Sequence, residues 1–430
     1  MKLKLRAILP CVFALISVAL PATLGQPTVS VVTAAPMAPV QPGQSVTMAV
    51  TASGSSLTYQ WKLNGADILG ATAASYTLMA AGAADRGSYQ ALVTGSGGTV
   101  TTEMGTMSVI ASDARLINLS ARAMVGTGND VLIAGFVSQG DTSSTNKNIL
   151  MRGMGPALAG MMGGMNSGVL STPVLTLYDG QSKAMGSNMG WMNAPSRATG
   201  GEASTVPATM QPAAMTMMNA LGAFAPAPGS ADSALMMNAP SGVYTAIMSG
   251  ANSSTGIGLV ECYDADNASN NATNTARLVN MSARANAGAG NSSLIAGFVI
   301  VPGPMGTPAT VLLRAMGPSL SHMGVTNFMA TPAMTLFDSA SKPIASNAGW
   351  GNAPTMAAGN SASPVRAGIE PASAGMMAQV GAFPATAGSA DSALIATLPP
   401  GAYSMVVSDS SNNTGGAMTG VVLVEVYELK

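Results

Sequence analysis

The amino-acid sequence predicts an all-β protein in three parts, the last two of which are copies of one another. Residues 115–264 return as residues 277–428, and a repeated unit of about 150 residues has the size of a whole domain. Glycine, alanine, serine and threonine are abundant, whereas charged residues make up only 8% of the chain. Apolar runs are short and end at turn residues, which is typical of strands. We therefore expect sandwich or jelly-roll-like layouts with only short helices.

Residues 1–25 are expected to be a secretory signal peptide and not part of the fold. Lys2, Lys4 and Arg6 make a basic start, residues 8–20 are apolar, and small residues follow where cleavage would occur. The apolar run is short for a bilayer span, and an uncleaved anchor is the alternative. The sequence thus predicts an exported protein, secreted or at the cell surface, with no membrane span in its mature part.

Residues 27–111 form the first part, and their pattern differs from that of the repeats. The run 44–54 alternates apolar and polar residues as a half-buried strand does. Asn64 followed by Gly65 is a turn signal, and the run before it carries Trp61. These features predict a small antiparallel sandwich.

Two motifs in this first part resemble the immunoglobulin-like family. Trp61 matches the tryptophan that the family carries on its third strand, and the motif D-x-G-x-Y, which ends at Tyr89, matches its tyrosine-corner segment. The resemblance implies an immunoglobulin-like sandwich over residues 27–111. The positions at which the family usually has cysteines hold Val50 and Ala91, so the core is expected to hold by packing alone.

The two copies, residues 113–264 and 277–430, are interpreted as homologous β-rich domains joined by a polar linker at 265–276. Most of their apolar runs have the length of single strands. A helix is expected only at 212–221, where Met and Leu recur along one face, and at its counterpart 374–380.

The repeated unit carries five motifs: an R-x-x-N-x-S-x-R start, LIAGFV, R-x-x-GP-x-L, GS-x-D-x-AL and a closing LVEVYE. With these motifs it resembles a domain found in large secreted proteins of Verrucomicrobia-like bacteria, often behind immunoglobulin-like modules. The resemblance spans both copies and implies the same modular architecture, but it assigns no activity. We expect the two copies to share one fold, with length changes confined to loops.

Charge is scarce, with 17 basic and 18 acidic side chains and a net charge of −1. No basic patch could neutralise a run of phosphates, so we exclude nucleic acid as a partner. Among the charged residues that recur at matching positions, six are candidates for structural ion pairs: Arg152 and Arg314, Asp232 and Asp391, Glu261 and Glu425. Because buried charges need partners, each arginine is expected to bond the aspartate or the glutamate of its own copy. The alternative is a polar ligand site in each copy.

No pattern in the chain points to an enzyme. The single histidine, His322, has no counterpart in the first copy, so a Ser-His-Asp triad could exist in one copy only. No H-E-x-x-H motif, Cys/His metal spacing or phosphate-binding glycine loop occurs. We therefore expect no catalytic residue, no metal site and no cofactor. The alternative is a secreted enzyme with an unrecognised carboxylate site in the repeats.

Trp191 and Trp350 are the candidate ligand-binding residues. They lie in matching segments rich in glycine, asparagine and proline, which predict loops. Each indole could be a platform on which a sugar ring stacks, or it could fold over the edge of its sandwich. Cys262 stands where the second copy has Val426, so we expect it to be a buried and inert core residue.

Taken together, these features favour a non-catalytic protein that is exported and acts outside the cell as a binding or structural module, for instance in adhesion. Its partner would be an extracellular protein or a polysaccharide. A carbohydrate-binding accessory protein is the alternative within this class, and it would need a groove lined by Trp191 or Trp350.

Overall fold

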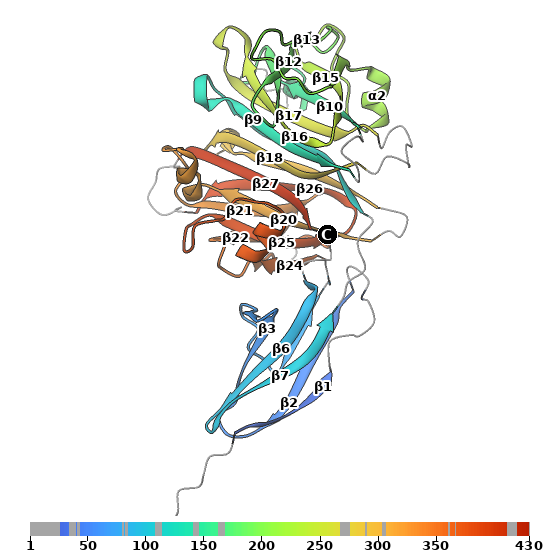
Figure 1. The fold of residues 1–430 in the computed structure, drawn as a ribbon. Coiled ribbons are helices and arrows are strands. Elements are labelled where there is room, and N and C mark those ends of the chain that lie inside the picture. The colour runs from blue at the N-terminus through green and yellow to red at the C-terminus, as the bar shows by residue number, and fades with distance from the viewer. Residues whose placement is uncertain are drawn as a thin grey trace, which may run out of the picture.

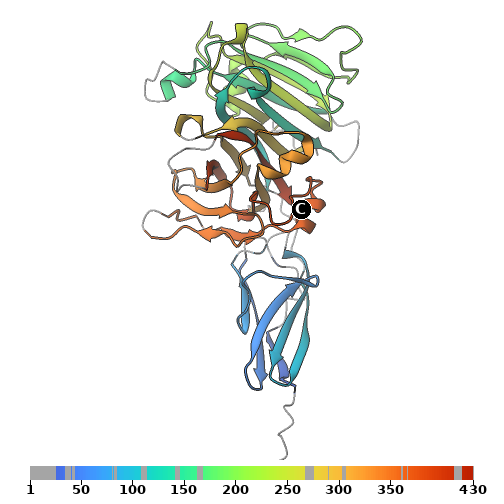
Figure 2. The same ribbon diagram turned by 90° about the vertical axis from the view of Figure 1, so that its left-hand side faces the viewer.

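The computed structural model describes residues 26–33, 40, 44–79, 81, 85–107, 114–140, 146–161, 168–266, 276–288, 290–302, 307–359, 362–365, 367–410 and 419–429. The predicted signal peptide at 1–25 and residues 267–275 of the predicted linker lie outside them. The fold is all-β, as predicted. Figures 1 and 2 show an elongated molecule with the first part at one end, and with the second copy between that part and the first copy.

The first part is a two-layer antiparallel sandwich. Its strands are β1 (Thr28–Thr33), β2 (Val46–Ser53), β3 (Thr58–Leu63), β4 (Ala66–Asp67), β5 (Ser75–Leu78), β6 (Gly87–Gly95) and β7 (Gly98–Met107). One sheet has the order β1-β2-β5 and the other β4-β3-β6-β7. Alternation along β2 buries Val46, Met48 and Val50 and turns the residues between them outward, as the sequence pattern predicts.

Both marks of the immunoglobulin-like sandwich have the expected geometry. Trp61 is buried on β3, and its Nε1 donates to a backbone oxygen at 2.9 Å. Tyr89 on β6 donates its hydroxyl to the backbone oxygen of Asp85 at 2.9 Å, which forms the tyrosine corner. Val50 and Ala91 are both buried between the sheets. Packing therefore takes the place of the usual disulfide.

The two copies contain matching sets of strands. Copy 1 holds β8 (Arg115–Val125), β9 (Leu132–Gln139), β10 (Asn146–Met154), β11 (Pro173–Asp179), β12 (Ala184–Asn188), β13 (Ser196–Arg197), β14 (Thr209–Pro212), β15 (Ser233–Pro240), β16 (Gly242–Gly250) and β17 (Gly256–Asp264). Copy 2 holds β18 (Arg277–Ala287), β19 (Ile295–Val301), β20 (Ala309–Met316), β21 (Pro332–Asp338), β22 (Pro343–Ala348), β23 (Thr355–Met356), β24 (Gly368–Pro371), β25 (Ser392–Leu398), β26 (Gly401–Asp409) and β27 (Gly420–Leu429).

Each copy is built of two antiparallel layers. In copy 1 they are β14-β15-β10-β17-β8 and β13-β12-β11-β16-β9. In copy 2 they are β24-β25-β20-β27-β18 and β23-β22-β21-β26-β19. The registers also agree, because Arg152 opposes Glu261 in copy 1 and Arg314 opposes Glu425 in copy 2. The two copies share one fold.

Helices are few and short. They are α1 (Leu158–Met161), α2 (Met215–Ala220) and α3 (Ala374–Gln379), with 3-10 turns η2 (Gly128–Asp130), η3 (Ala251–Ser253), η5 (Gly290–Ser292) and η6 (Pro318–Met323). The two helices predicted at 212–221 and 374–380 are α2 and α3, but α2 begins later than predicted. The reason is that β14, which ends at Pro212, pairs with β15 and so cannot join the helix. Within α2, Met218 is buried, whereas Met215 is exposed.

The copies are joined by strand pairing, not only by the linker. Strand β18 of copy 2 pairs with β9 of copy 1, and β19 of copy 2 pairs with β8 of copy 1. We call these four strands the seam. One buried apolar cluster runs across it, and it includes Leu116 and Phe136 of copy 1 and Met281 and Phe298 of copy 2. Within the described part of the chain, no helix is long and apolar enough to cross a bilayer.

Candidate functional site

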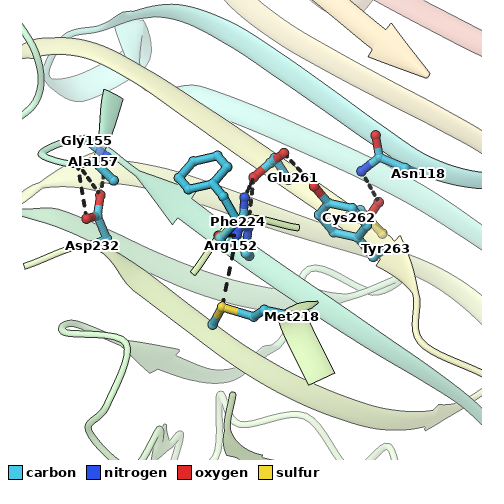
Figure 3. Close-up of polar contacts among 10 residues, drawn as sticks. All are labelled: Asn118, Arg152, Gly155, Ala157, Met218, Phe224, Asp232, Glu261, Cys262 and Tyr263. Carbon is cyan, nitrogen blue, oxygen red and sulfur yellow. Dashed lines mark hydrogen bonds and ion pairs between the residues drawn. The ribbon is translucent and has the colours of Figure 1, made fainter. Parts of the chain in front are cut away.

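Arg152 lies at the centre of a buried polar cluster between β10 and helix α2 (Figure 3). Its Nε donates to Glu261 Oε2 at 2.8 Å, and its Nη2 donates to the same oxygen. The Phe224 ring covers the guanidinium at 4.6 Å, and the Phe224 carbonyl accepts from Nη1. Tyr263 donates its hydroxyl to Glu261 Oε1 at 2.8 Å. Because the arginine side chain is 0% exposed, a ligand has no access to its guanidinium.

Copy 2 repeats the cluster with the same residue types. Arg314 Nε lies 3.1 Å from Glu425 Oε2, and Nη1 donates to the Phe383 carbonyl at 2.7 Å. Tyr427 donates its hydroxyl to Glu425 Oε1 at 2.6 Å. Burial raises the pKa of the Glu425 carboxyl, while Arg314 and Tyr427 oppose that rise. Of the two partners expected for each arginine, the structure therefore brings together Arg314 with Glu425 and leaves Asp391 elsewhere.

The recurring aspartates hold a turn. Asp232 Oδ1 accepts from the backbone N–H of Gly155 at 2.6 Å, and its Oδ2 accepts from that of Ala157 at 3.2 Å. In copy 2, Asp391 accepts from the N–H of Gly317 at 2.7 Å and from that of Ser319 at 3.2 Å. The GS-x-D-x-AL motif and the R-x-x-GP-x-L motif recur together because they bond to each other. This role needs no arginine.

A second pair of aspartates closes the hairpin between β21 and β22 and its counterpart in copy 1. Asp338 Oδ1 accepts from the N–H of Ala340 and from that of Lys342, both at 2.9 Å, and Ser363 donates its hydroxyl to Oδ2 at 2.5 Å. The hydrogen bond from Ser363, together with the two backbone donors, holds the pKa of Asp338 below its ordinary value. Asp179 has matching partners and is likewise structural.

The two candidate tryptophans differ in exposure. Trp191 is only 3% exposed, and its Nε1 donates to the Ala227 carbonyl at 3.1 Å. It therefore has little free surface on which a sugar could stack, and its burial fits the alternative in which the indole packs on its own sandwich. Trp350 is half-buried, and its Nε1 donates to the Thr386 carbonyl at 2.9 Å. Only Trp350 keeps part of its surface available.

His322 lies at the surface of copy 2 but does not complete a catalytic triad. Its Nε2 is 3.3 Å from Thr386 Oγ1, which is 3.2 Å from Ser319 Oγ. Ser319 is buried and donates its hydroxyl directly to Asp391. The histidine is therefore separated by a threonine from the serine that it would have to activate, and the aspartate holds the serine instead of the imidazole.

A further buried cluster gathers chain segments at one end of the seam. Lys147 Nζ lies 2.6 Å from Asp264 Oδ1 and 3.0 Å from Asp266 Oδ2, and it donates to the Ala276 carbonyl at 2.8 Å. One lysine thus holds both ends of the linker. The repeat does not predict this role, because copy 2 has Ala309 at the matching position.

Arg277 extends this cluster across the seam. It donates to the Glu428 carboxylate and, at 2.9 Å from its Nη2, to the carbonyl of Ala114. The start of copy 1, the start of copy 2 and the end of copy 2 therefore meet at one guanidinium. These bonds fix the ends of the copies.

Cys262 is buried on β17, and burial, the largest effect, raises the pKa of its thiol far above the ordinary value. Among the residues that the structure describes, no group of three or more His, Cys, Asp or Glu side chains could hold a metal ion. The sequence-predicted charges are thus brought together as internal pairs and caps, not as one convergent site.

Among the solved structures that the chain resembles are immunoglobulin-domain proteins. No family model matches the chain, and no curated protein is similar to it. A titin M4 domain structure is 17% identical, with 20% of this chain and 96% of that one covered and a TM-score of 0.18. The four N-terminal immunoglobulin domains of Dscam1 isoform 4.44 are 18% identical, with 17% and 18% covered and a TM-score of 0.16. This chain thus spans about a fifth of the Dscam1 structure's length.

Proposed function

We propose that this protein is a non-catalytic module that is exported and binds or spaces other components outside the cell. One observation carries the proposal. The six recurring charged residues that were the candidates for a site are occupied by internal partners. Arg152 and Arg314 are held by glutamates, and Asp232 and Asp391 are held by backbone N–H groups. Recurrence of these residues is explained by the fold, so it supplies no argument for a reaction.

The arrangement of the parts supports the same proposal. The immunoglobulin-like sandwich lies at one end of the elongated molecule and the two copies extend away from it (Figure 1). Such a shape suits a spacer that presents one end at a distance from the other. Sandwiches of this kind host many functions, so the shape supports the proposal by analogy only.

A carbohydrate-binding role is the second candidate, and it concerns copy 2 alone. Trp350 is half-buried and bonds the carbonyl of Thr386, and the exposed Thr386 hydroxyl contacts His322. An aromatic face next to hydroxyl and imidazole groups has the chemistry that sugar rings bind. Copy 1 has no such surface, since Trp191 is buried. The role would therefore be specific to one copy.

The experiment uses the chain from residue 26 onward, tested on a glycan array and on peptide, ester and glycoside substrate panels. The proposal predicts saturable binding to an extracellular polysaccharide or protein and no turnover. If copy 2 binds glycans, Trp350→Ala should abolish the signal while Met356→Ala, at an exposed site of the same copy, should keep it. Turnover that is lost in Asp391→Asn protein with an unchanged melting temperature would contradict the proposal.

A further inference from the structure

The seam between the copies has the geometry of a two-fold symmetric interface. Ser282 on β18 lies opposite Gly135 on β9, and the matching residues Ser120 on β8 and Gly297 on β19 also lie opposite each other. The same exchange holds along both strand pairs, and the register shift near the start of β18 recurs near the start of β8. An interface in which residue i contacts j while j contacts i is the mark of identical partners.

Two of the five repeated motifs of the chain lie in this seam. The LIAGFV motif forms β9 and β19, and the R-x-x-N-x-S-x-R motif forms β8 and β18. A Cβ on Gly135 would lie 2.6 Å from Ser282 Oγ, and one on Gly297 would lie 2.5 Å from Ser120 Oγ. A side chain there would have to displace the serine hydroxyl, so the glycine of one motif makes room for the serine of the other. These motifs recur because they bind one another.

Apolar packing makes the seam part of the core. Leu116 and Leu278 pair with each other where the two copies meet, and both are buried. Phe136 stacks on Tyr244 at 5.4 Å between ring centroids, and Phe298 stacks on Tyr403 at 5.5 Å, so each copy presents the same aromatic pair. Separation of the copies would expose these side chains to water.

The edges of each copy show which side is built for pairing. On the side away from the seam, the layers end in the short strands β13, β14, β23 and β24, which span two to four residues. Short edge strands resist further pairing. The seam side instead presents β8 and β18, each 11 residues long, and β9 with 8 residues. Long edges with unpaired backbone groups need a partner strand.

We propose that the seam strands form a self-recognition surface, and that the partner they select is a second copy of the same repeated module. The chain is then a covalently joined pair of modules. The seam strands hold the two modules together, and the linker only raises their local concentration. The boundaries 113–264 and 277–430 accordingly mark two copies that complete one folding unit.

The test places a protease cleavage site within the linker at 267–275 of the chain from residue 26 onward. After complete cleavage, the two fragments should co-elute as one complex in size-exclusion chromatography with light scattering. Fragments that separate under native conditions, while each keeps its far-UV circular dichroism spectrum, would overturn the proposal. So would fragments that separate and unfold at concentrations where the uncleaved chain is folded.

A size swap tests the geometry within the cleaved complex. Gly297→Ser should weaken association about tenfold or more, since it crowds Ser120 Oγ in a packed interface. Adding Ser120→Gly to the same protein should restore most of the affinity, because the glycine and the serine have only exchanged places. Gly351→Ser, which meets open space, is the matched control and should change nothing. A single substitution without effect, or a double variant without recovery, would contradict the assignment of these contacts.

Discussion

At the scale of single residues, each buried ion pair has a large effect on the stability of the fold. Arg152 is wholly buried, and its removal would take the donor from a buried carboxylate and a carbonyl. Removing one member of such a pair leaves the other unpaired in a medium of low polarity. The cost is therefore much larger than the net contribution of the intact pair.

Arg152→Met should lower the free energy of unfolding by about 3–5 kcal/mol. The double variant Arg152→Met/Glu261→Met should recover much of that loss, since no unpaired charge remains. Lys183→Met serves as the control, because its ion pair with Glu202 is exposed and should be worth less than about 1 kcal/mol. Urea unfolding measures all three, and an unchanged Arg152→Met midpoint would show that the pair is not buried as described.

The Asp338 carboxylate should make the stability of the protein depend on pH in the acid range. Its hydrogen bonds hold the pKa below the ordinary value in the folded state, so it contributes stability above the unfolded-state pKa of about 4. That contribution is lost as the pH falls through the lower folded-state pKa. Asp338→Asn should flatten the decline in the urea midpoint between neutral and acid pH, and Asp67→Asn, at an exposed site, should not. Identical pH profiles for wild type and Asp338→Asn would refute this role.

At the scale of elements, strand positions follow from the sequence and strand partners do not. Alternation in the run 44–54 predicts β2, and the LIAGFV motif predicts β9 and β19. The helix predicted at 212–221 is only partly correct, because Pro212 belongs to strand β14, which pairs with β15. The alternation of apolar and polar residues indicates which face of a strand is buried, but not which strand pairs with it. The seam could therefore not be predicted.

The same limit applies to the candidate site residues. Matching positions in the two copies correctly single out Arg152 and Arg314, whose partners lie opposite in the register. Comparison of the copies cannot find Lys147, which exists in one copy only. The tryptophan segments are alike in sequence, yet Trp191 is buried and Trp350 is half-buried, because exposure depends on the covering loops.

The glycine of the R-x-x-GP-x-L turn gives a prediction for an element. In copy 2 a Cβ on Gly317 would overlap the backbone oxygen of Met329, which cannot rotate away. Gly317→Ala should therefore destabilise the protein by about 1–3 kcal/mol, as overpacking does. Gly351→Ala, which meets open space, should leave stability nearly unchanged. Thermal unfolding of the two variants compares them, and equal melting temperatures would mean that the turn tolerates a side chain.

At the scale of the whole molecule, the central claim is that the two copies form one unit through a symmetric seam. The copies share a buried core, their layers continue into one another, and Lys147 and Arg277 fasten the chain ends at the seam. A destabilising substitution in the core of one copy should then also lower the stability of the other. The immunoglobulin-like sandwich has its own core and need not respond.

Cys262 allows this coupling to be measured directly. It is the single thiol of the chain from residue 26 onward, it is buried in copy 1, and copy 2 has Val426 in its place. Its labelling by a thiol reagent across a urea series therefore reports the opening of copy 1 alone. The variant Arg314→Met breaks the buried pair of copy 2 without touching copy 1. If the copies form one unit, this variant will shift the Cys262 labelling midpoint to lower urea, in step with the global unfolding curve. A labelling midpoint that stays at the wild-type value while copy 2 unfolds early would contradict the account.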